Sequence, residues 1–196
     1  MNLTIQRVKA TAAGAALIAG VIGVGASTAR AAIYDRGSFS FHFEDSFAEC
    51  GLANLHSSTD LVDHFVQRVG TGSQAGLFPG GANIDVTTVV TNLDNGKWFT
   101  IKEDFRSQQL PATNLGGTLW LGRGQTVGTT TVLDSDGRVV ARDAGRQLNT
   151  TLFDDLGDHA PGGELIAELE TRVVGHHPLA EMTEEQGCAL EVALIG

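Results

Sequence analysis

The sequence is poor in proline, cysteine, aromatic residues and positive charge. Only four prolines occur in 196 residues, which excludes a collagen-like chain and a proline-rich linker. The 13 Lys and Arg residues are outnumbered by 23 Asp and Glu residues, so the net charge is −10. An acidic chain is repelled by polyanions, so we expect neither a nucleic acid nor an anionic membrane surface as a partner. Hydrophobic residues make up 42% of the chain, enough for the core of one domain.

Common catalytic signatures are also missing. The sequence contains no Gly-x-Ser-x-Gly motif, no His-Glu-x-x-His motif and no glycine-rich phosphate loop that ends in Lys-Ser or Lys-Thr. Their absence argues against the hydrolase and nucleotide chemistries that use them. An enzyme built from scattered His and Asp residues remains open, because catalytic groups are defined by their geometry in the fold.

The first 31 residues have the three-part layout of a secretory signal peptide. Arg7 and Lys9 are followed by an uncharged run, rich in Ala and Gly, from Ala10 to Ala29. Small residues at Ala29 and Ala31 predict cleavage between Ala31 and Ala32. A retained transmembrane anchor is the alternative, since the run is 20 residues long.

Cleavage would leave a single secreted domain, residues 32–196, with ten basic and 23 acidic residues and a net charge of −13. We expect this domain to be extracellular and monomeric, with no membrane attachment after the signal is removed.

Cys50 and Cys188 are the only cysteines. In an exported chain, two cysteines predict an intramolecular disulfide, which would close a loop of about 139 residues. A metal pair or a catalytic thiol is the alternative. Neither has the expected neighbours, such as a Cys-x-x-Cys motif.

Much of the chain consists of short segments that either alternate apolar with polar residues or are rich in β-branched residues. Gly, Asp and Asn separate these segments, and the pattern predicts an antiparallel all-β fold of about eight or nine strands. The hairpin at Asp94-Asn95-Gly96 is the clearest signal, because Asn-Gly tolerates the positive φ of a tight turn. Asp136-Gly137 predicts a second hairpin. Without long amphipathic helices between the strands, a barrel or a sandwich is expected, and the abundant glycine, 25 residues, suits its turns and bends. The expected strands are 38–44, 59–69, 83–91, 97–101, 116–122, 126–133, 138–142, 148–154 and 164–174.

The C-terminal segment predicts a short helix. Pro178 closes a loop, and Thr183 with Gln186 matches a capping box ahead of Leu190 and Val192. A disulfide from Cys188 would fasten this helix to the β-domain.

Three groups of residues are candidates for a metal site or an acid–base site, and each group also has an ordinary structural explanation. His56, Asp60, Asp63 and His64 could form a metal or acid–base site, as could His176-His177; a solvated polar face and a loop are the alternatives. The acidic loop with Asp154, Asp155, Asp158 and Glu164 is a weak calcium candidate. We predict no other metal and no cofactor. Trp98 and Trp120 are expected to lie in the core rather than on a sugar-binding surface.

Several short features occur along the chain: Cys50-Gly51, Val90-Thr91-Asn92 leading to Asn95-Gly96-Lys97, Asp136-Gly137, Gly175-His176, and Cys188 followed by Ala189-Leu190. In this combination the sequence resembles a group of small secreted actinobacterial proteins of unknown function. The resemblance implies one β-barrel-like or sandwich domain with a C-terminal helix, and no known activity or catalytic residue. The sequence departs from the group in a longer loop at Leu110–Gly117.

Taken together, these features favour a non-catalytic β-protein that binds a small apolar ligand or an extracellular partner. A barrel of about eight strands is just wide enough for one small ligand. A secreted isomerase, cyclase or hydrolase, or a structural protein of the cell envelope, is the alternative.

Overall fold

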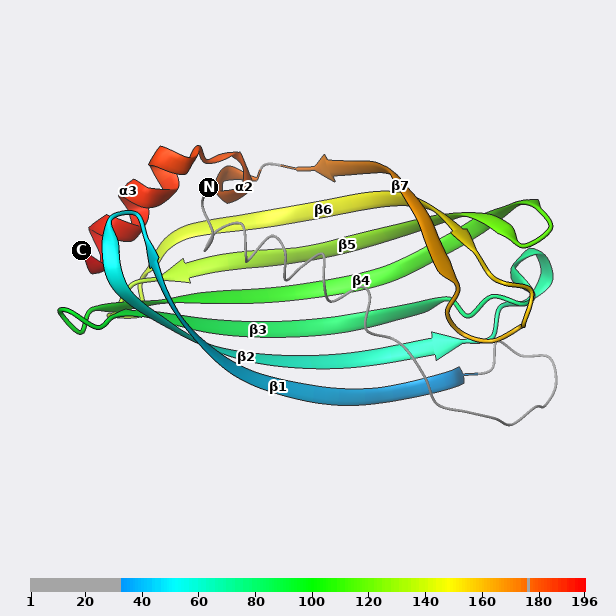
Figure 1. The fold of residues 1–196 in the computed structure, drawn as a ribbon, viewed down its shortest axis with the longest axis horizontal. Helices are drawn as coiled ribbons and strands as arrows, with labels where there is room; N and C mark the ends of the chain where they lie inside the picture. The colour runs from blue at the N-terminus through cyan, green and yellow to red at the C-terminus, as the bar shows by residue number, and fades with distance from the viewer. Residues whose placement is uncertain (1–32, 176) are drawn as a thin grey trace.

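The computed structural model of the chain describes residues 33–175 and 177–196 as one antiparallel sheet followed by two helices (Figure 1). The expected signal peptide and its cleavage site at Ala31 and Ala32 lie outside the described residues. No helix in the described part of the chain is long and apolar enough to cross a membrane. The strands are β1 (Ile33–Glu49), β2 (Leu52–Arg68), β3 (Gly80–Asn92), β4 (Trp98–Gly116), β5 (Leu119–Leu133), β6 (Val139–Asp154) and β7 (Glu164–Val174), and the helices are η2 (Gly72–Gln74), α2 (Pro178–Glu181) and α3 (Glu184–Ile195).

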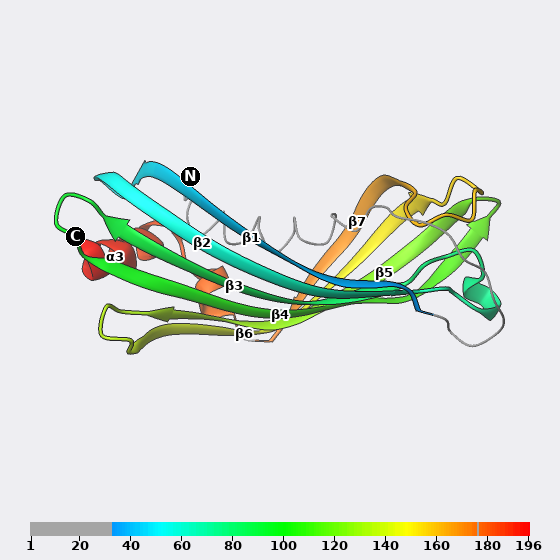
Figure 2. The same cartoon turned by 90° about the horizontal axis from the view of Figure 1, so that it is seen from below.

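Each strand pairs with the next along the chain, in the order β1 to β7. The all-β antiparallel prediction with a C-terminal helix is therefore confirmed. The sheet is strongly curved (Figure 2), yet within residues 33–175 and 177–196 its first and last strands are not paired with each other. The described strands thus form one open sheet of seven long strands.

The expected count of eight or nine strands was wrong because two predicted breaks do not interrupt a strand. Residues 116–122 and 126–133 belong largely to β5, and residues 138–142 and 148–154 to β6. Glycine was taken as a break in both places. In fact Gly124 and Gly145, which lie at these two places, stay in the ladder, and an added Cβ would collide with the Asn149 side chain at Gly124 and with the His177 ring at Gly145. Glycine here allows close packing rather than a turn.

The loop expected at Leu110–Gly117 is also wrong, because β4 continues to Gly116. Register shifts against β5 fall between Leu110 and Thr113 and between Asn114 and Gly116. They mark β-bulges, and the first contains Pro111, which has no N–H to give to the ladder.

The predicted Asn-Gly hairpin joins β3 to β4. Gly96 has a φ of 71° and donates its N–H to the Asn92 carbonyl at 2.8 Å, while Asn95 Oδ1 accepts from Lys97 N at 2.9 Å. A second tight turn joins β1 to β2, where Cys50 and Gly51 have φ values of 54° and 79°. Two successive positive φ angles are the requirement of a type I′ hairpin turn, so Cys50 lies at a hairpin tip.

One face of the sheet, here called the inner face, packs against the two helices. Its core joins side chains of β2 to β5 with one residue of each helix, and consists of Leu55, Val90, Phe99, Ile101, Val132, Leu179 and Ile195. Period-two alternation places Phe39, Phe41 and Phe43 on the same face. They lie at the β1 edge, away from the helices, and Phe41 is 56% exposed and Phe43 48%.

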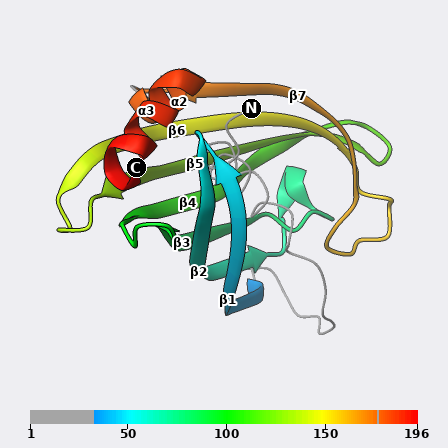
Figure 3. The ribbon, with the colours of Figure 1, turned by 60° about the vertical axis from the view of Figure 1, so that its left-hand side comes forward.

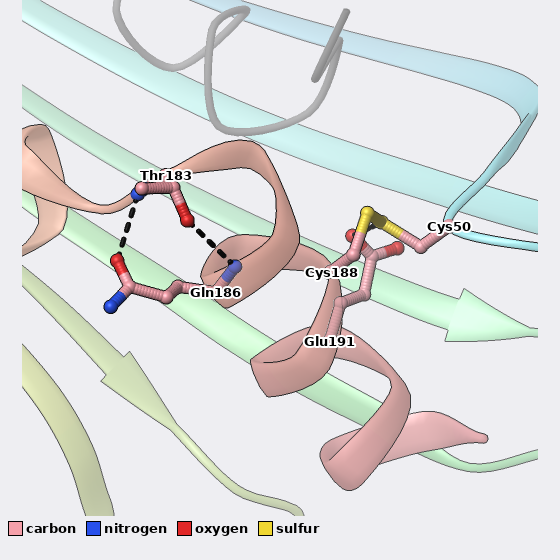
Figure 4. The surroundings of a disulfide bond; sticks show 5 residues. All are labelled: Cys50, Thr183, Gln186, Cys188 and Glu191. Atoms are coloured by element: carbon pink, nitrogen blue, oxygen red, sulfur yellow. Dashed lines mark hydrogen bonds between the residues drawn. A yellow bond between two sulfur atoms is a disulfide. The ribbon is translucent and has the colours of Figure 1, made fainter.

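Helix α3 is fastened at both of its ends. At its start, the Thr183 side chain accepts from Gln186 N at 3.2 Å and Gln186 Oε1 accepts from Thr183 N at 2.9 Å, which confirms the capping box (Figure 4). At its end, the side-chain amides of Asn92 and Asn95 both donate to the Ile195 carbonyl at 2.9 Å. The β3–β4 hairpin therefore satisfies a helix carbonyl that has no partner within the helix.

The predicted disulfide between Cys50 and Cys188 is present, with the two Cα atoms 5.0 Å apart. The tip of the β1–β2 hairpin turns out of the sheet toward α3 (Figures 1 and 3), and the disulfide joins the two there. Segments separated by 138 positions in the sequence are thereby held together.

Replacement of both cysteines, Cys50→Ala with Cys188→Ala, should lower the free energy of unfolding by about 5 kcal/mol, because the unfolded chain regains the freedom of a very long loop. Chemical denaturation of the oxidised protein and of the double variant measures the difference. A loss below about 1 kcal/mol would contradict this role of the disulfide.

Candidate functional site

A cavity of about 200 Å³ lies between the inner face and the two helices. Strands β4, β5 and β6 form its floor, and α2 and α3 form its roof, with Leu179, Leu190 and Leu194 among the roof residues. Its lining is mainly apolar. Three carboxylate residues and one histidine also line it: Glu103, Asp143, Glu191 and His177.

Glu103 lies on the cavity floor because of the alternation in β4. Phe99, Ile101 and Phe105 share its parity and form the apolar side of this strand. The register places Glu103 opposite Thr130 of β5, and Thr130 opposite Asp143 of β6. With neighbouring strands about 4.8 Å apart, the Glu103 and Asp143 backbones are about 10 Å apart, one on each side of Thr130.

Burial changes the acidity of Glu103. The residue is 4% exposed, and its one side-chain hydrogen bond within residues 33–175 and 177–196 is a long contact of 3.4 Å from the Thr130 hydroxyl to Oε1. Loss of hydration raises the pKa of Glu103 to about 7, and the Thr130 hydrogen bond opposes this rise. Near neutral pH the Glu103 side chain is therefore divided between a neutral acid that can donate a hydrogen bond and a carboxylate that can accept one.

His177 and Asp143 are in contact at the edge of the cavity. His177 Nδ1 lies 2.8 Å from Asp143 Oδ1, although the contact lacks the alignment of a hydrogen bond. Asp143 Oδ2 accepts from Ala180 N at 3.2 Å, and His177 Nε2 lies 3.3 Å from the Val174 carbonyl. A Cβ on Gly145 would collide with the imidazole ring, so glycine at this position admits His177 against β6.

Glu191 lies beside the disulfide in the roof of the cavity (Figure 4). It is 5% exposed, its Oε1 has no hydrogen-bond partner among the described residues, and its Oε2 lies 3.7 Å from Cys50 Sγ. A disulfide sulfur has no proton to donate, so this contact does not stabilise a carboxylate. Burial first, and repulsion from Glu49 second, raise the pKa of Glu191 to about 7.

The predicted cluster of His56, Asp60, Asp63 and His64 is divided between the two faces of β2. Asp60 and His64 share the outer face, as their parity predicts, and Asp60 Oδ1 lies 2.8 Å from His42 Nδ1. His42 also lies 3.5 Å from Glu44, and the hydrogen bond that His42 donates to Asp60 is the main cause of the raised pKa of His42. Asp63 is buried on the inner face, where loss of hydration raises its pKa. The four residues therefore do not form one site.

In the acidic loop after β6, the carboxylate oxygens accept hydrogen bonds that stabilise the turns of the loop itself. Asp154, Asp155 and Asp158 each accept a hydrogen bond from the backbone N–H two residues later, at 2.8 to 3.0 Å, and Asp155 also accepts from Trp120 Nε1 at 2.8 Å. Glu164 is paired with Asp154 in the β6–β7 ladder. Across the part of the chain that the structure describes, no three His, Cys, Asp or Glu residues are grouped so that they could hold a metal ion.

The two tryptophans differ in position. Trp120 is buried at 6% exposure, as expected. Trp98 was also expected in the core, and this was wrong, because Trp98 is 38% exposed at the start of β4. Trp98 is paired with Thr91 of β3, and the alternation of side chains along β4 places it on the outer face of the sheet.

Sequence reasoning singled out His177 and did not find Glu103, Asp143 or Glu191. A signal was present for two of them. Glu103 interrupts the apolar parity of Phe99, Ile101 and Phe105, and Glu191 lies on the helical stripe of Leu190 and Leu194. Asp143 follows Arg142 in a polar stretch and has no such signature. His176, the expected partner of His177, lies outside the described residues.

Comparisons with models of protein families, with curated proteins and with solved structures find no match to this chain. The resemblance to secreted actinobacterial proteins stays a prediction from the sequence. What is established is a β-rich domain with one disulfide and a C-terminal helix.

The raised pKa of Glu103 predicts a pH-dependent stability. Between its ordinary pKa of 4.5 and about 7, the unfolded chain has lost this proton and the folded chain keeps it, so the free energy of unfolding falls as the pH rises. Glu103→Gln removes this effect. The variant should gain about 3 kcal/mol relative to the wild type between pH 4.5 and pH 8, measured by urea unfolding at each pH. A difference that does not change with pH would contradict the assignment.

Proposed function

We propose that this protein binds a small, mainly apolar molecule with one hydrogen-bonding group, a carbonyl or a hydroxyl, in the cavity below α3. The observation that carries the proposal is Glu103, a buried carboxyl group in a mainly apolar cavity, for which the described residues supply only one long hydrogen bond. A buried polar group without good partners costs free energy, and a bound ligand would supply the missing partner.

The size of the cavity supports a small ligand. An apolar cavity of about 150 Å³ can hold benzene, so about 200 Å³ suits a molecule of one or two rings. Drug-sized ligands occupy larger pockets, about 300 to 1,000 Å³. Consistent with this reading, we propose that the domain acts outside the cell after removal of residues 1–31, where its disulfide would persist.

Binding of 1-indanone, compared with that of indane, tests the proposal. Both fit the cavity, and only 1-indanone has a carbonyl. At pH 5.5, where Glu103 is protonated, 1-indanone should bind about fivefold more tightly, the value of one net hydrogen bond. The advantage should disappear at pH 8.5 in the wild type and persist in Glu103→Gln, whose amide still donates. Ligand-observed NMR titrations measure these affinities.

A matched pair of variants on β5 locates the binding. Thr126 lines the cavity, whereas Thr129 has the opposite parity and lies on the outer face. Thr126→Trp fills the cavity and should abolish binding of both probes, and Thr129→Trp should leave it within twofold. The proposal is wrong if neither probe binds the wild type at millimolar concentration, or if the two variants behave alike.

Catalysis is a second candidate function, favoured by the pKa of Glu103 near 7. A group with such a pKa can both take and return a proton at neutral pH. With 1-indanone in D₂O, a Glu103 carboxylate that takes a proton from C2 would leave an enolate; the carboxyl proton would exchange with D₂O, and transfer of the resulting deuteron to C2 would restore the ketone and the carboxylate. Exchange at C2 that requires Glu103 and exceeds the buffer rate would support an enzyme. Binding without exchange would support a binding protein.

A further inference from the structure

The outer face of β4 to β7 is basic, although the protein as a whole is acidic. Six of the ten Lys and Arg residues in the described part of the chain lie on this face, and all six are exposed. We call them the outer basic face: Lys102, Arg106, Arg123, Arg142, Arg146 and Arg172. None of these six takes part in an ion pair within residues 33–175 and 177–196.

The register of the sheet fixes the spacing of four of these charges. Lys102 and Arg142 lie opposite each other across Thr131, and Arg106 and Arg146 lie opposite each other across Val127. Two strand spacings separate the members of each pair by about 10 Å, and four residues along a strand separate the pairs by about 13 Å. The four bases therefore lie at the corners of a rectangle, two on β4 and two on β6, with β5 between them.

The charge of this rectangle is incompletely balanced. Asp104 lies on the β4 side of the rectangle, opposite Thr129, and Asp85 of β3 is paired with Asp104 just outside it, so four positive charges face two negative charges. The net charge of −10 repels polyanions at long range. At physiological ionic strength, however, the Debye length is about 8 Å. A partner that lies flat on this face therefore interacts mainly with the local positive charge.

The remaining side chains favour a hydroxyl-rich partner. Thr129, Thr131, Gln108 and Gln125 lie between the bases on the same face and can donate and accept hydrogen bonds. Trp98 lies on this face four residues before Lys102, and its half-exposed ring offers an apolar surface. One aromatic ring is too few for the series of stacked bases by which proteins hold single-stranded nucleic acids.

We propose that the outer basic face binds an anionic polysaccharide that carries sulfate or carboxylate groups. Arginine guanidinium groups form paired hydrogen bonds with such anions, and five of the six bases are arginine. This surface lies on the side of the sheet opposite the cavity, so the proposal is independent of the ligand proposed there.

Immobilised heparin tests the proposal on the disulfide-bonded protein by biosensor titration. The wild type should bind at about 150 mM salt, with an affinity that falls as salt rises. Arg142→Ser with Arg146→Ser should weaken binding at least tenfold. The control, Arg36→Ser with Arg138→Ser, removes the same charge from exposed positions outside the face and should stay within twofold. Trp98→Ala should weaken heparin binding several-fold. Thermal melting checks that each variant is folded.

Three outcomes would overturn the proposal. The first is no binding of heparin at about 150 mM salt. The second is an equal loss in both double variants, which would show that only net charge matters. The third is tighter binding to single-stranded DNA or to phosphatidylglycerol vesicles than to heparin, which would assign the face to nucleic acid or to a membrane.

Discussion

The attachment of helix α3 to the inner face is the constraint on which the candidate site depends. The helix supplies Leu190, Glu191 and Leu194 to the cavity roof, yet it is only 12 residues long. A helix of this length is marginal by itself in water. Three separate contacts hold it in place: the disulfide to the β1–β2 hairpin, the capping box at its start, and the amides of the β3–β4 hairpin at its end.

These contacts give the two hairpins a second role. Asn95 shapes the β3–β4 turn through its side-chain oxygen and holds the helix through its side-chain nitrogen. Lys97 donates to the Gly196 carbonyl beyond the same helix end, where a positive charge also opposes the negative end of the helix dipole. Cys50 occupies the tip of the other hairpin. The turns therefore order the sheet and also fix the roof of the cavity.

The two faces of the sheet present opposite chemistry. The inner face encloses buried carboxyl groups in apolar surroundings, where loss of hydration favours their neutral forms. The outer face carries exposed arginines that form no ion pair in the described part of the chain, with the carboxylates of Asp85, Asp104 and Glu170 on the same face. A small neutral ligand suits the first environment, and an extended anionic partner suits the second.

Local patterns determined much of the fold. Period-two alternation, the Asn-Gly and Asp-Gly turns, the capping box and the cysteine pair predicted an antiparallel sheet, two hairpins, a C-terminal helix and the disulfide, because each depends on residues close in sequence or on an unambiguous pairing. The strand count was too high, since glycine can mark either a turn or a close contact within a strand. Gly124 and Gly145 proved to be the second kind, and only neighbouring strands reveal that.

The site shows where the sequence stops being informative. Glu103 could be recognised as a carboxylate on an apolar strand face, because alternation is a local property. That Asp143 and His177 would meet, and that Glu191 would lie against the disulfide, depends on segments separated by tens of residues. The basic face is similar: six bases spread over 70 positions become one surface only through the register of four strands. The sequence by itself determined the net charge of −10, and the tertiary structure decided where the positive charges gather, because only strand pairing brings them together.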